Sequence, residues 1–377
     1  MTHNQPLYCQ RCLMDSTALD FTLYDDNTCN FCSEFLERNS NHINAPYDTI
    51  HKLSNQFEHI RSLSSKKKKY DCLIGISGGV DSSWVLHLAV QHGLRPLVVH
   101  FDNTWNSGLA TRNVRNIVET LDVDLVTYIV NYEKFDRALK AFLDLDILDL
   151  ELLTDHLLIS LNFSVAALHG IKYILSGDNI ATEGVLMPSN WNWFKYDFVN
   201  INSILHANGV KAHGLPLLSF SKLFYYKFVR RIRWLSPLNT VTYVKDNAID
   251  KLVELYDYQP YPYKHYESIL TRFYQGYILP QKGNIDKRRV HLSTLVLTNQ
   301  ISRSDALALL QQSPYLDHIE QYEDLQFFRD KLYLTQEYLD DYLHRPFQSH
   351  LNYMSILPLW RKLRKLVRTP FPPYCLS

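Results

Sequence analysis

This sequence of 377 residues has a formal net charge of zero, no long apolar run, and few cysteines outside two close pairs. Lysine plus arginine and aspartate plus glutamate both number 39, so no global field draws the chain to nucleic acid. No stretch reaches the roughly 18 uninterrupted apolar residues of a membrane-spanning helix, and residues 1–6 lack the apolar core of a secretory signal. We therefore expect a cytoplasmic enzyme-like protein, because 46% hydrophobic and 21% charged residues are ordinary globular values.

Four of the six cysteines form two close pairs, Cys9 with Cys12 and Cys29 with Cys32. In a chain without an export signal, this spacing indicates metal ligation before it indicates disulfides. Four thiolates leave no position open for water, so we expect a structural zinc site, with an iron–sulfur or redox role as the alternative. Such an ion would fold a module too short to build its own core, which we place at residues 1–45.

The two remaining cysteines leave little room for further thiol chemistry. Cys72 lies in an apolar strand pattern, where a free cysteine is usually a small buried group, and Cys375 is close to the end. Hydrolysis of glutamine ordinarily takes a cysteine nucleophile with an adjacent base. We therefore expect neither a built-in glutaminase nor a sulfur relay in this chain.

The middle of the chain alternates between strand and helix patterns. A linker or helix at 46–69, with a solvated run at Ser64–Lys69, precedes this region at 70–245, and a mostly helical region follows at 246–377. Strands alternating with helices predict an α/β fold with a doubly wound parallel sheet. The predicted strands are Asp71–Ile76, Pro96–Phe101, Leu125–Val130 and Ile171–Leu175.

A glycine turn follows the first predicted strand and leads into a helix pattern. Gly78 and Gly79 let the backbone approach an anion closely, and the amides at the start of the helix favour phosphate there. The lysine of a G-x-x-x-x-G-K-[ST] loop is missing, so other groups must neutralise the phosphates. Asp81 can hold a Mg²⁺ ion that bridges phosphate oxygens. Hydroxyl donors are available from Ser77, Ser82 and Ser83.

Two more polar clusters follow predicted strands, at His100–Asn103 and Gly177–Asn179. The carboxyl ends of parallel strands lie on one edge of a sheet, which is where ligands bind in open α/β folds. We therefore expect these clusters and the glycine turn to form one site.

The turn Ser77–Ser83 resembles the pyrophosphate (PP) loop of the ATP pyrophosphatase superfamily, whose members release pyrophosphate by forming an adenylated intermediate. A plain strand-to-helix turn is the alternative. The resemblance implies that Ile76, Phe101 and Asp102 border the adenine and ribose. It also implies that Gly177 and Asp178 close the phosphate side of the site.

Further segments resemble the bacterial N-acetyl sugar amidotransferases, which make acetamidino sugars for surface polysaccharides such as the O-antigen, capsule and nonulosonic acids. The paired cysteines fit this family, and the likeness extends to about residue 315. Thr104 and Tyr261–Tyr263 stand where glycines are usual in the family. The segments that carry the likeness are Asp102–Ser107, Thr154–His156, Ala181–Gly184, Lys264–Gln275 and Asp286–Arg289.

This resemblance implies a reaction, its partners and a set of site residues. ATP would adenylate the N-acetyl carbonyl of a nucleotide sugar or sugar acid, and ammonia would then displace AMP. The ammonia would come from a separate glutaminase with a barrel subunit, similar to the pair in histidine biosynthesis. The catalytic candidates are Asp81, Asp155, His156, Lys264 and Arg272. The acceptor candidates are Asn103, Trp105, Thr182, Glu183, His265, Glu267, Tyr274, Lys287 and Arg288.

Several of these candidates have plainer alternatives. His156, placed at the start of a helix pattern, is a candidate proton acceptor from attacking ammonia, although a lone histidine is more often structural. Lysine and arginine suit the phosphates or carboxylate of the acceptor, yet the run Lys287–Arg289 could be a solvated face. The basic and aromatic stretches Lys222–Trp234 and Trp360–Arg368 could lie on a membrane surface or pack on the protein.

Two rival functions use the same features. Enzymes of transfer RNA thiolation have similar loops and cysteine pairs, but the neutral net charge and the lack of spare thiols argue against nucleic-acid modification here. A zinc-knuckle interaction module without catalysis is the second rival. Formation of AMP with a sugar or with transfer RNA would separate these functions.

Overall fold

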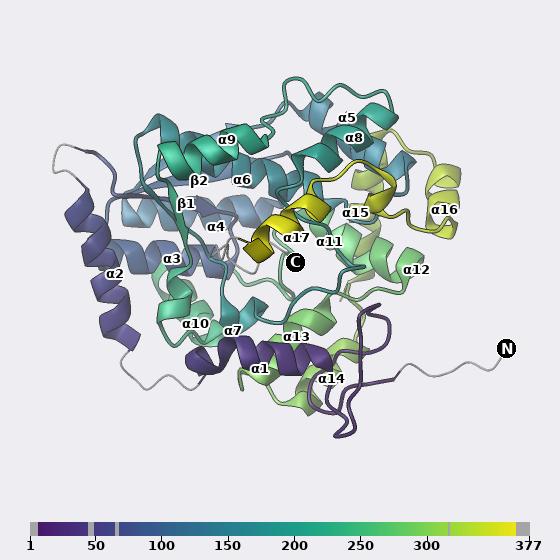
Figure 1. Cartoon of the computed structure of the whole chain (residues 1–377), viewed down its shortest axis with the longest axis horizontal. Coiled ribbons are helices and arrows are strands. Elements are labelled where there is room, and N and C mark those ends of the chain that lie inside the picture. Colours follow the sequence, from purple (N-terminus) through teal and green to yellow (C-terminus); the bar gives the residue numbers. More distant parts are fainter. Residues whose placement is uncertain (1–6, 44–48, 65–67, 316, 367–377) are drawn as a thin grey trace.

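A five-stranded parallel sheet organises the middle of the chain (Figure 1). The computed structural model describes residues 7–43, 49–64, 68–315 and 317–366, so Met1–Pro6, Cys375 and parts of the Ser64–Lys69 and Trp360–Arg368 stretches lie outside the described residues. The strand order is β3-β2-β1-β4-β5. The strands are β1 (Cys72–Ile76), β2 (Pro96–Asp102), β3 (Asp124–Ile129), β4 (Tyr173–Leu175) and β5 (Arg233–Leu235).

Successive side chains of the central strands enter two different hydrophobic layers. Leu73 and Ile174 pack into the layer that holds α5 (Tyr132–Asp144), α6 (Glu151–Leu168) and α8 (Phe198–Ala207). Ile74 and Leu175 pack on the opposite face. That face is covered by α2 (Thr49–Leu63), α3 (Val80–Gln91), α4 (Gly108–Leu121) and α10 (Lys245–Tyr256). The predicted doubly wound α/β fold is therefore confirmed.

The four predicted strands are all present, with ends shifted by one or two residues. The strand β5 was missed, because it has three residues and lies inside a basic aromatic stretch without an apolar run. The helix pattern that the sequence places at His156 begins at Glu151, so Asp155 and His156 lie in its second turn and do not open it.

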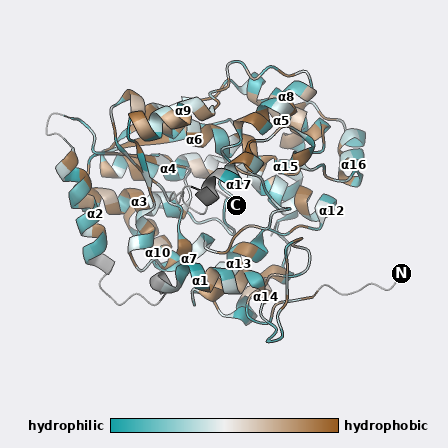
Figure 2. Cartoon of the chain, in the orientation of Figure 1, coloured by the Kyte–Doolittle hydropathy of each residue, from teal (hydrophilic) through white to brown (hydrophobic). Residues whose placement is uncertain are grey.

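Helix α6 is the one helix in the described ranges with the length and hydropathy of a membrane-spanning segment. Of its residues, 67% are buried inside the fold, because it packs against β1, β2 and β4 as a core helix. Hydrophobic residues gather on the helices that flank the sheet, whereas outer helices such as α16 (Gln336–His344) are mostly hydrophilic (Figure 2).

The amino-terminal module, which includes α1 (Asn30–Ile43), lies against the carboxy-terminal helices α13 (Arg288–Leu297) and α14 (Arg303–Gln311) (Figure 1). The amide of Leu13 donates to Ser293 Oγ at 3.0 Å, and Arg289 donates to the carbonyl of Leu13 at 2.9 Å. Buried side chains of the module, the sheet and the carboxy-terminal helices form one continuous cluster. The module and the carboxy-terminal region thus pack as parts of the same core.

Candidate functional site

A pocket of about 420 Å³ opens at the carboxyl edge of the sheet. Residues from all three predicted clusters line it, among them Ser77 after β1, Phe101 and Asn103 at the end of β2, and Gly177 after β4. The carboxy-terminal region contributes a second wall, which includes Lys264. The structure therefore brings the predicted clusters together with a segment more than eighty residues further along the chain.

Two turns at the edge of the sheet each require a glycine, Gly78 in the glycine turn and Gly177 in the turn after β4. Gly78 has φ +88°, and a Cβ there would lie 2.7 Å from the carbonyl oxygen of Ala110. A Cβ on Gly177 would lie 2.7 Å from the amide nitrogen of Ser82, so the two turns are in backbone contact. Gly79 caps α3 without a side-chain hydrogen bond. The first amides of this helix are consequently free to bind an anion in the pocket.

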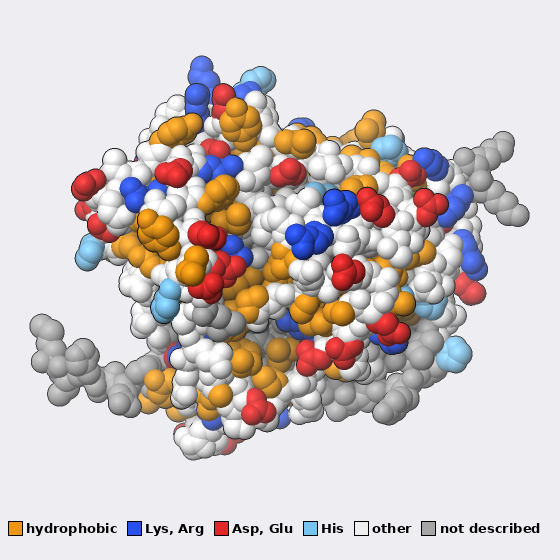
Figure 3. Space-filling model, turned by 180° about the vertical axis from the view of Figure 1, so that it is seen from behind, with side chains coloured by type: hydrophobic (Ala, Val, Ile, Leu, Met, Phe, Trp, Pro, Cys, Tyr) orange, Lys and Arg blue, Asp and Glu red, His pale blue; other side chains and the backbone are white. Residues whose placement is uncertain are grey.

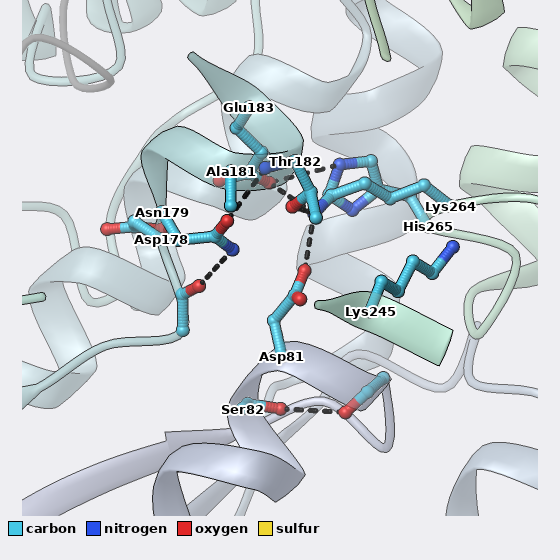
Figure 4. Close-up of polar contacts among 12 residues, drawn as sticks. Asp81, Ser82, Asp178, Asn179, Ala181, Thr182, Glu183, Lys245, Lys264 and His265 are labelled. Atoms are coloured by element: carbon cyan, nitrogen blue, oxygen red, sulfur yellow. Dashed lines mark hydrogen bonds and ion pairs between the residues drawn. The ribbon is translucent and has the colours of Figure 1, made fainter. Parts of the chain in front are cut away.

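Lys264 is the centre of an ion-pair network that joins three parts of the chain (Figure 4). Its ammonium contacts Asp81 at the start of α3 and lies 3.0 Å from Glu183 Oε1 in α7 (Ile180–Glu183). It also donates to Thr182 Oγ1 at 2.9 Å. The hydroxyl of Tyr243 donates to the other oxygen of Asp81 at 2.5 Å. These contacts satisfy both oxygens of the Asp81 carboxylate.

The same network changes the protonation of its members. Burial would lower the pKa of Lys264, but the carboxylates of Asp81 and Glu183 outweigh burial and raise it. Burial raises the pKa of Glu183 to about 7, with Asp178 and Asp81 adding to the rise and Lys264 opposing it. Burial and the neighbouring Lys264 lower the pKa of His265 to about 3. Near neutral pH the pocket therefore holds a charged lysine, a neutral histidine and a carboxyl group that exchanges a proton.

A second lysine, Lys245, is the first residue of α10, and it also lines the pocket (Figure 4). Within the described part of the chain its ammonium has neither a hydrogen bond nor an ion pair, and burial and Lys264 lower its pKa. An uncompensated cation beside the glycine turn can neutralise phosphate. Lys245 could not be predicted from the sequence, because it belongs to no motif and lies far from the glycine turn along the chain.

A further polar group lines the pocket on the side of α6. Lys195 pairs with Asp149 at 2.7 Å and with Asp155 at 3.0 Å, and Lys287 pairs with Glu151. Enclosure by the protein raises the pKa of Asp155, although Lys195 opposes the rise. The predicted residues Asp155 and Lys287 therefore meet in the pocket, while sequence reasoning missed Lys195 and Glu151.

The structure corrects the roles predicted for His156 and Arg272. His156 is fully buried, its Nδ1 donates to the carbonyl of Lys195 at 2.8 Å, and its Nε2 accepts from the amide of Leu218 at 2.9 Å. Burial lowers its pKa to about 4, so it is a structural link between two loops and cannot take a proton from ammonia. Arg272 lies outside the pocket and binds both oxygens of Asp324, at 2.6 and 2.7 Å.

Other predicted residues also lie outside the pocket. Trp105 is fully buried, and its indole N–H donates to Asp136 at 3.1 Å, so it is a core residue and not an acceptor contact. Tyr274 is buried too, and its hydroxyl donates to the carbonyl of Leu148. Arg288 is held by Asp286 and by backbone carbonyls. The remaining predicted residues that do not line the pocket are Gly78, Ser83, Asp102 and Thr182.

Seven of the predicted nucleotide-loop and edge residues and five of the acceptor residues line the pocket directly. The former are Ile76, Ser77, Gly79, Ser82, Phe101, Gly177 and Asp178. The latter are Asn103, Glu183, His265, Glu267 and Lys287. With Asp81, Asp155 and Lys264, they place nucleotide-binding and acceptor-binding candidates around one space.

The four paired cysteines form a separate buried group whose sulfur atoms all lie within 4.8 Å of one another. The Sγ atoms of Cys9 and Cys32 are 3.6 Å apart, and those of Cys12 and Cys29 are 3.7 Å apart. Arg303 of α14 donates to the carbonyls of Cys9 at 2.9 Å and Cys12 at 3.2 Å. The group can hold one metal ion, and none of its members lines the pocket.

The fold and the site together define a doubly wound α/β protein with a PP-loop-type turn. A family model described as "LPS biosynthesis protein WbpG-like, C-terminal domain" matches residues 267–367, where LPS is lipopolysaccharide. Residues 267–367 are thus similar to the carboxy-terminal domain of WbpG-like LPS biosynthesis proteins, and the predicted likeness to a surface-polysaccharide family is confirmed. No curated protein matches the chain in sequence.

Three solved structures resemble the chain only at low sequence identity and low TM-score. NMN synthetase from Francisella tularensis is 16% identical, covers 58% of this chain and 89% of its own, and gives a TM-score of 0.31. The U34-tRNA thiolase NcsA from Methanococcus maripaludis, solved with its [4Fe-4S] cluster, is 10% identical, with coverages of 88% and 89% and a TM-score of 0.32. The NH3-dependent NAD synthetase from Campylobacter jejuni is 12% identical, with coverages of 55% and 93% and a TM-score of 0.29.

We predict that Lys264→Met lowers the free energy of unfolding by about 1 to 3 kcal/mol, because it leaves two partly buried carboxylates without their cation. Asp81→Asn should recover part of this loss when it is added to Lys264→Met, since it removes one of those charges. The measurement is urea unfolding of the single and double variants. Lys251→Met is the control, because Lys251 and Glu254 form an exposed pair. Equal effects of Lys264→Met and Lys251→Met would contradict the role of the network.

Proposed function

We propose that the protein is an ATP-dependent amidotransferase. It would adenylate the N-acetyl carbonyl of a sugar and replace the carbonyl oxygen with ammonia, releasing AMP and pyrophosphate. The observation that carries the proposal is that the glycine turn, Lys264, Lys245 and Glu183 all line the same pocket. The WbpG-like domain supports a product for surface polysaccharide, such as O-antigen, capsule or a nonulosonic acid. The acceptor would be a nucleotide sugar or a sugar acid, and the reaction would take place in the cytoplasm.

The first half of the reaction uses the nucleotide side of the pocket. The triphosphate binds at the Ser77–Ser82 turn, with adenine against Ile76 and Phe101. The N-acetyl oxygen attacks the α-phosphorus, the bond to the β-phosphate breaks, and pyrophosphate leaves. Lys245 and Lys264 neutralise charge on the phosphates, which favours this step through electrostatic stabilisation.

The second half needs a group that accepts a proton. Ammonia attacks the carbon of the adenylated acetamido group, the nitrogen loses a proton, and AMP leaves with the former carbonyl oxygen. Glu183 is the acceptor that we propose in place of His156, because it lines the pocket and its pKa of about 7 lets it take the proton near neutral pH. Asp155 and Lys287 would orient the acceptor from the opposite wall.

The carboxylate groups in the pocket are suitable ligands for a magnesium ion. Asp81 and Asp178 offer the carboxylate oxygens that Mg²⁺ prefers, and the ion would neutralise charge between phosphates. Both oxygens of Asp81 are engaged by Tyr243 and Lys264, so Lys264 would have to turn from Asp81 toward the phosphates for Asp81 to bind the ion. Asp178 accepts a hydrogen bond from the indole N–H of Trp234 at 3.2 Å, and a carboxylate has acceptor capacity for further partners.

Zinc fits the cysteine group. A tetrahedral ion with Zn–S bonds of about 2.3 Å holds its sulfurs about 3.8 Å apart. The pairs Cys9–Cys32, Cys12–Cys29 and Cys29–Cys32 are 3.6, 3.7 and 3.8 Å apart. A four-iron cluster would spread the sulfurs further, because each thiolate binds a different iron. We therefore propose one structural zinc ion in the amino-terminal module.

Ammonia would be supplied by a separate glutaminase with a barrel subunit. The four paired cysteines form the group that can hold a metal ion. Cys72 is fully buried in β1, where burial raises the pKa of its thiol. Neither environment suits a nucleophile for glutamine. Modification of transfer RNA remains the rival function, and the face in Figure 3 mixes basic and acidic side chains without a continuous basic surface.

The reaction products test the proposed function most simply. With ATP, an N-acetyl sugar acceptor and ammonium, the purified protein should form AMP and pyrophosphate, whereas labelled glutamine should deliver nitrogen only when partner proteins are added. Asp81→Asn and Ser82→Ala should lower AMP formation by about 100-fold, because they remove contacts to the phosphates or their metal. Ser83→Ala is the matched control, since Ser83 is buried outside the pocket. ADP and phosphate as products, or AMP formed only with transfer RNA, would refute the proposal.

The second test is the pH dependence of amidine formation at a fixed concentration of free ammonia. Glu183 accepts a proton only when ionised, so the rate should fall as the pH falls through about 7. Glu183→Gln should lower the rate by about 100-fold or more and remove this dependence, while pyrophosphate release in the absence of ammonia continues. An unchanged pH profile in the variant would exclude Glu183 as the proton acceptor.

The third test concerns the metal. We expect about one zinc ion per chain in purified protein, and we expect Cys12→Ser to lose it and Cys375→Ser to keep it. Metal content is measured by elemental analysis, and thermal unfolding should show that a chelator destabilises the protein. Stoichiometric iron with visible absorbance would replace the zinc assignment with an iron–sulfur site.

A further inference from the structure

Acidic residues are absent from two long stretches of this otherwise neutral sequence. There is no Asp or Glu between residues 198 and 245, and there is none between residues 342 and 377. Both stretches are rich in Lys, Arg and aromatic residues, although basic and acidic residues are equal in number over the whole chain. Positive charge is therefore concentrated in two segments and balanced by acidic residues elsewhere.

The two segments meet in the fold. Trp360 of α17 (Leu357–Leu366) packs edge-on against Phe220, the first residue of α9 (Phe220–Phe224), with ring centroids 6.4 Å apart. Trp360 also stacks on Phe194 at 5.7 Å. The buried carboxylate of Asp197 fixes the approach to α17, because it accepts a hydrogen bond from Ser355 Oγ at 2.6 Å. The two stretches without acidic residues thus contribute to one surface.

A row of phenylalanines points away from the protein on this surface. Phe220, Phe224 and Phe228 are spaced four residues apart along α9 and the π-helical turn η1 (Tyr225–Val229), so they share one face. They are 48%, 52% and 59% exposed. The opposite side of the same segment is anchored, since Tyr226 stacks on Phe163 of α6 at 5.9 Å. Figure 2 shows hydrophobic residues on α9 although it lies on the outside. We name residues 220–233 and α17 the basic aromatic face.

We propose that the basic aromatic face docks on an anionic membrane surface. Exposed phenylalanines can enter the boundary between headgroups and acyl chains, while the exposed Lys222 and Arg231 beside them attract anionic headgroups. The sequence of α17, with its leucines, tryptophan and four basic residues, has the composition of a helix that lies in a membrane interface.

The shape of the apolar surface favours lipid over the other binding partners of a basic region. Single-stranded nucleic acid is held by aromatic rings on which bases stack, inside a basic groove. Here the exposed row also includes the aliphatic side chains of Val229 and Leu359, at 61% and 56% exposure, which acyl chains accommodate and bases do not stack on. The absence of acidic residues complements the negative charge of a lipid surface over both segments.

Docking would place one wall of the pocket next to the membrane. Phe194 stacks on Trp360, and the adjacent Lys195 lines the pocket. The docking inference itself does not depend on the proposed reaction, since no residue of the face lines the pocket, although the next residue after it, Trp234, does. A loss of membrane binding and a loss of AMP formation can therefore be told apart.

The test is co-sedimentation of the full chain with vesicles of phosphatidylcholine, with and without phosphatidylglycerol. We expect binding to the anionic vesicles that weakens with salt. Phe224→Ser with Phe228→Ser, and Lys222→Glu with Arg231→Glu, should each reduce it by about tenfold or more. The matched control is Ile319→Ser with Tyr322→Ser, because these side chains are equally exposed on α15 (His318–Leu332) but lie among acidic residues.

Circular dichroism shows that each variant is folded, and AMP formation with a soluble acceptor should be unchanged in all of them. The proposal is overturned if the wild-type chain does not bind anionic vesicles, or if the control pair loses as much binding as the phenylalanine pair. It is also overturned if the basic aromatic variants lose binding to transfer RNA in a gel shift while vesicle binding is absent.

Discussion

The contact of Lys264 with Asp81 and Glu183 is the interaction on which the site depends. It joins the helix after the glycine turn, the short helix after β4 and the carboxy-terminal segment, so it sets the positions of the pocket walls relative to one another. Burial raises the pKa of Glu183 to about 7 although Lys264 opposes the rise, so Glu183 can exchange a proton near neutral pH. Binding of a polyphosphate would offer Lys264 a competing anion, so the two halves of the proposed reaction would be electrostatically coupled.

The carboxy-terminal domain connects this site to the cysteine module. Its first residues, with Glu267, line the pocket, while α13 and α14 hold the module through Arg289 and Arg303. A metal ion in the module would therefore stabilise the packing of the carboxy-terminal helices whose region lines the pocket, without taking part in the reaction. This arrangement accounts for a closed four-cysteine group in an enzyme whose pocket contains no cysteine.

The sequence predicted the parts of the structure that depend on local pattern. Apolar strands ending in polar turns revealed four of the five strands and placed Ser77, Phe101 and Gly177 on one edge. Contacts between distant residues could not be predicted in this way. His156 is satisfied by two backbone groups and Arg272 by Asp324, and no local pattern reveals such partners. Lys195 and Lys245 reach the pocket from segments without any motif, so only the fold could show them.

The central claim is that the N-acetyl oxygen of the acceptor becomes bonded to the α-phosphorus of ATP. An acceptor sugar labelled with oxygen-18 in its N-acetyl carbonyl tests this directly, because the label follows the bond that breaks. After turnover with ammonium, mass spectrometry of the nucleotide should show AMP that carries one labelled oxygen, and the amidine product should have lost it. Unlabelled AMP together with label retained in the sugar would contradict the account.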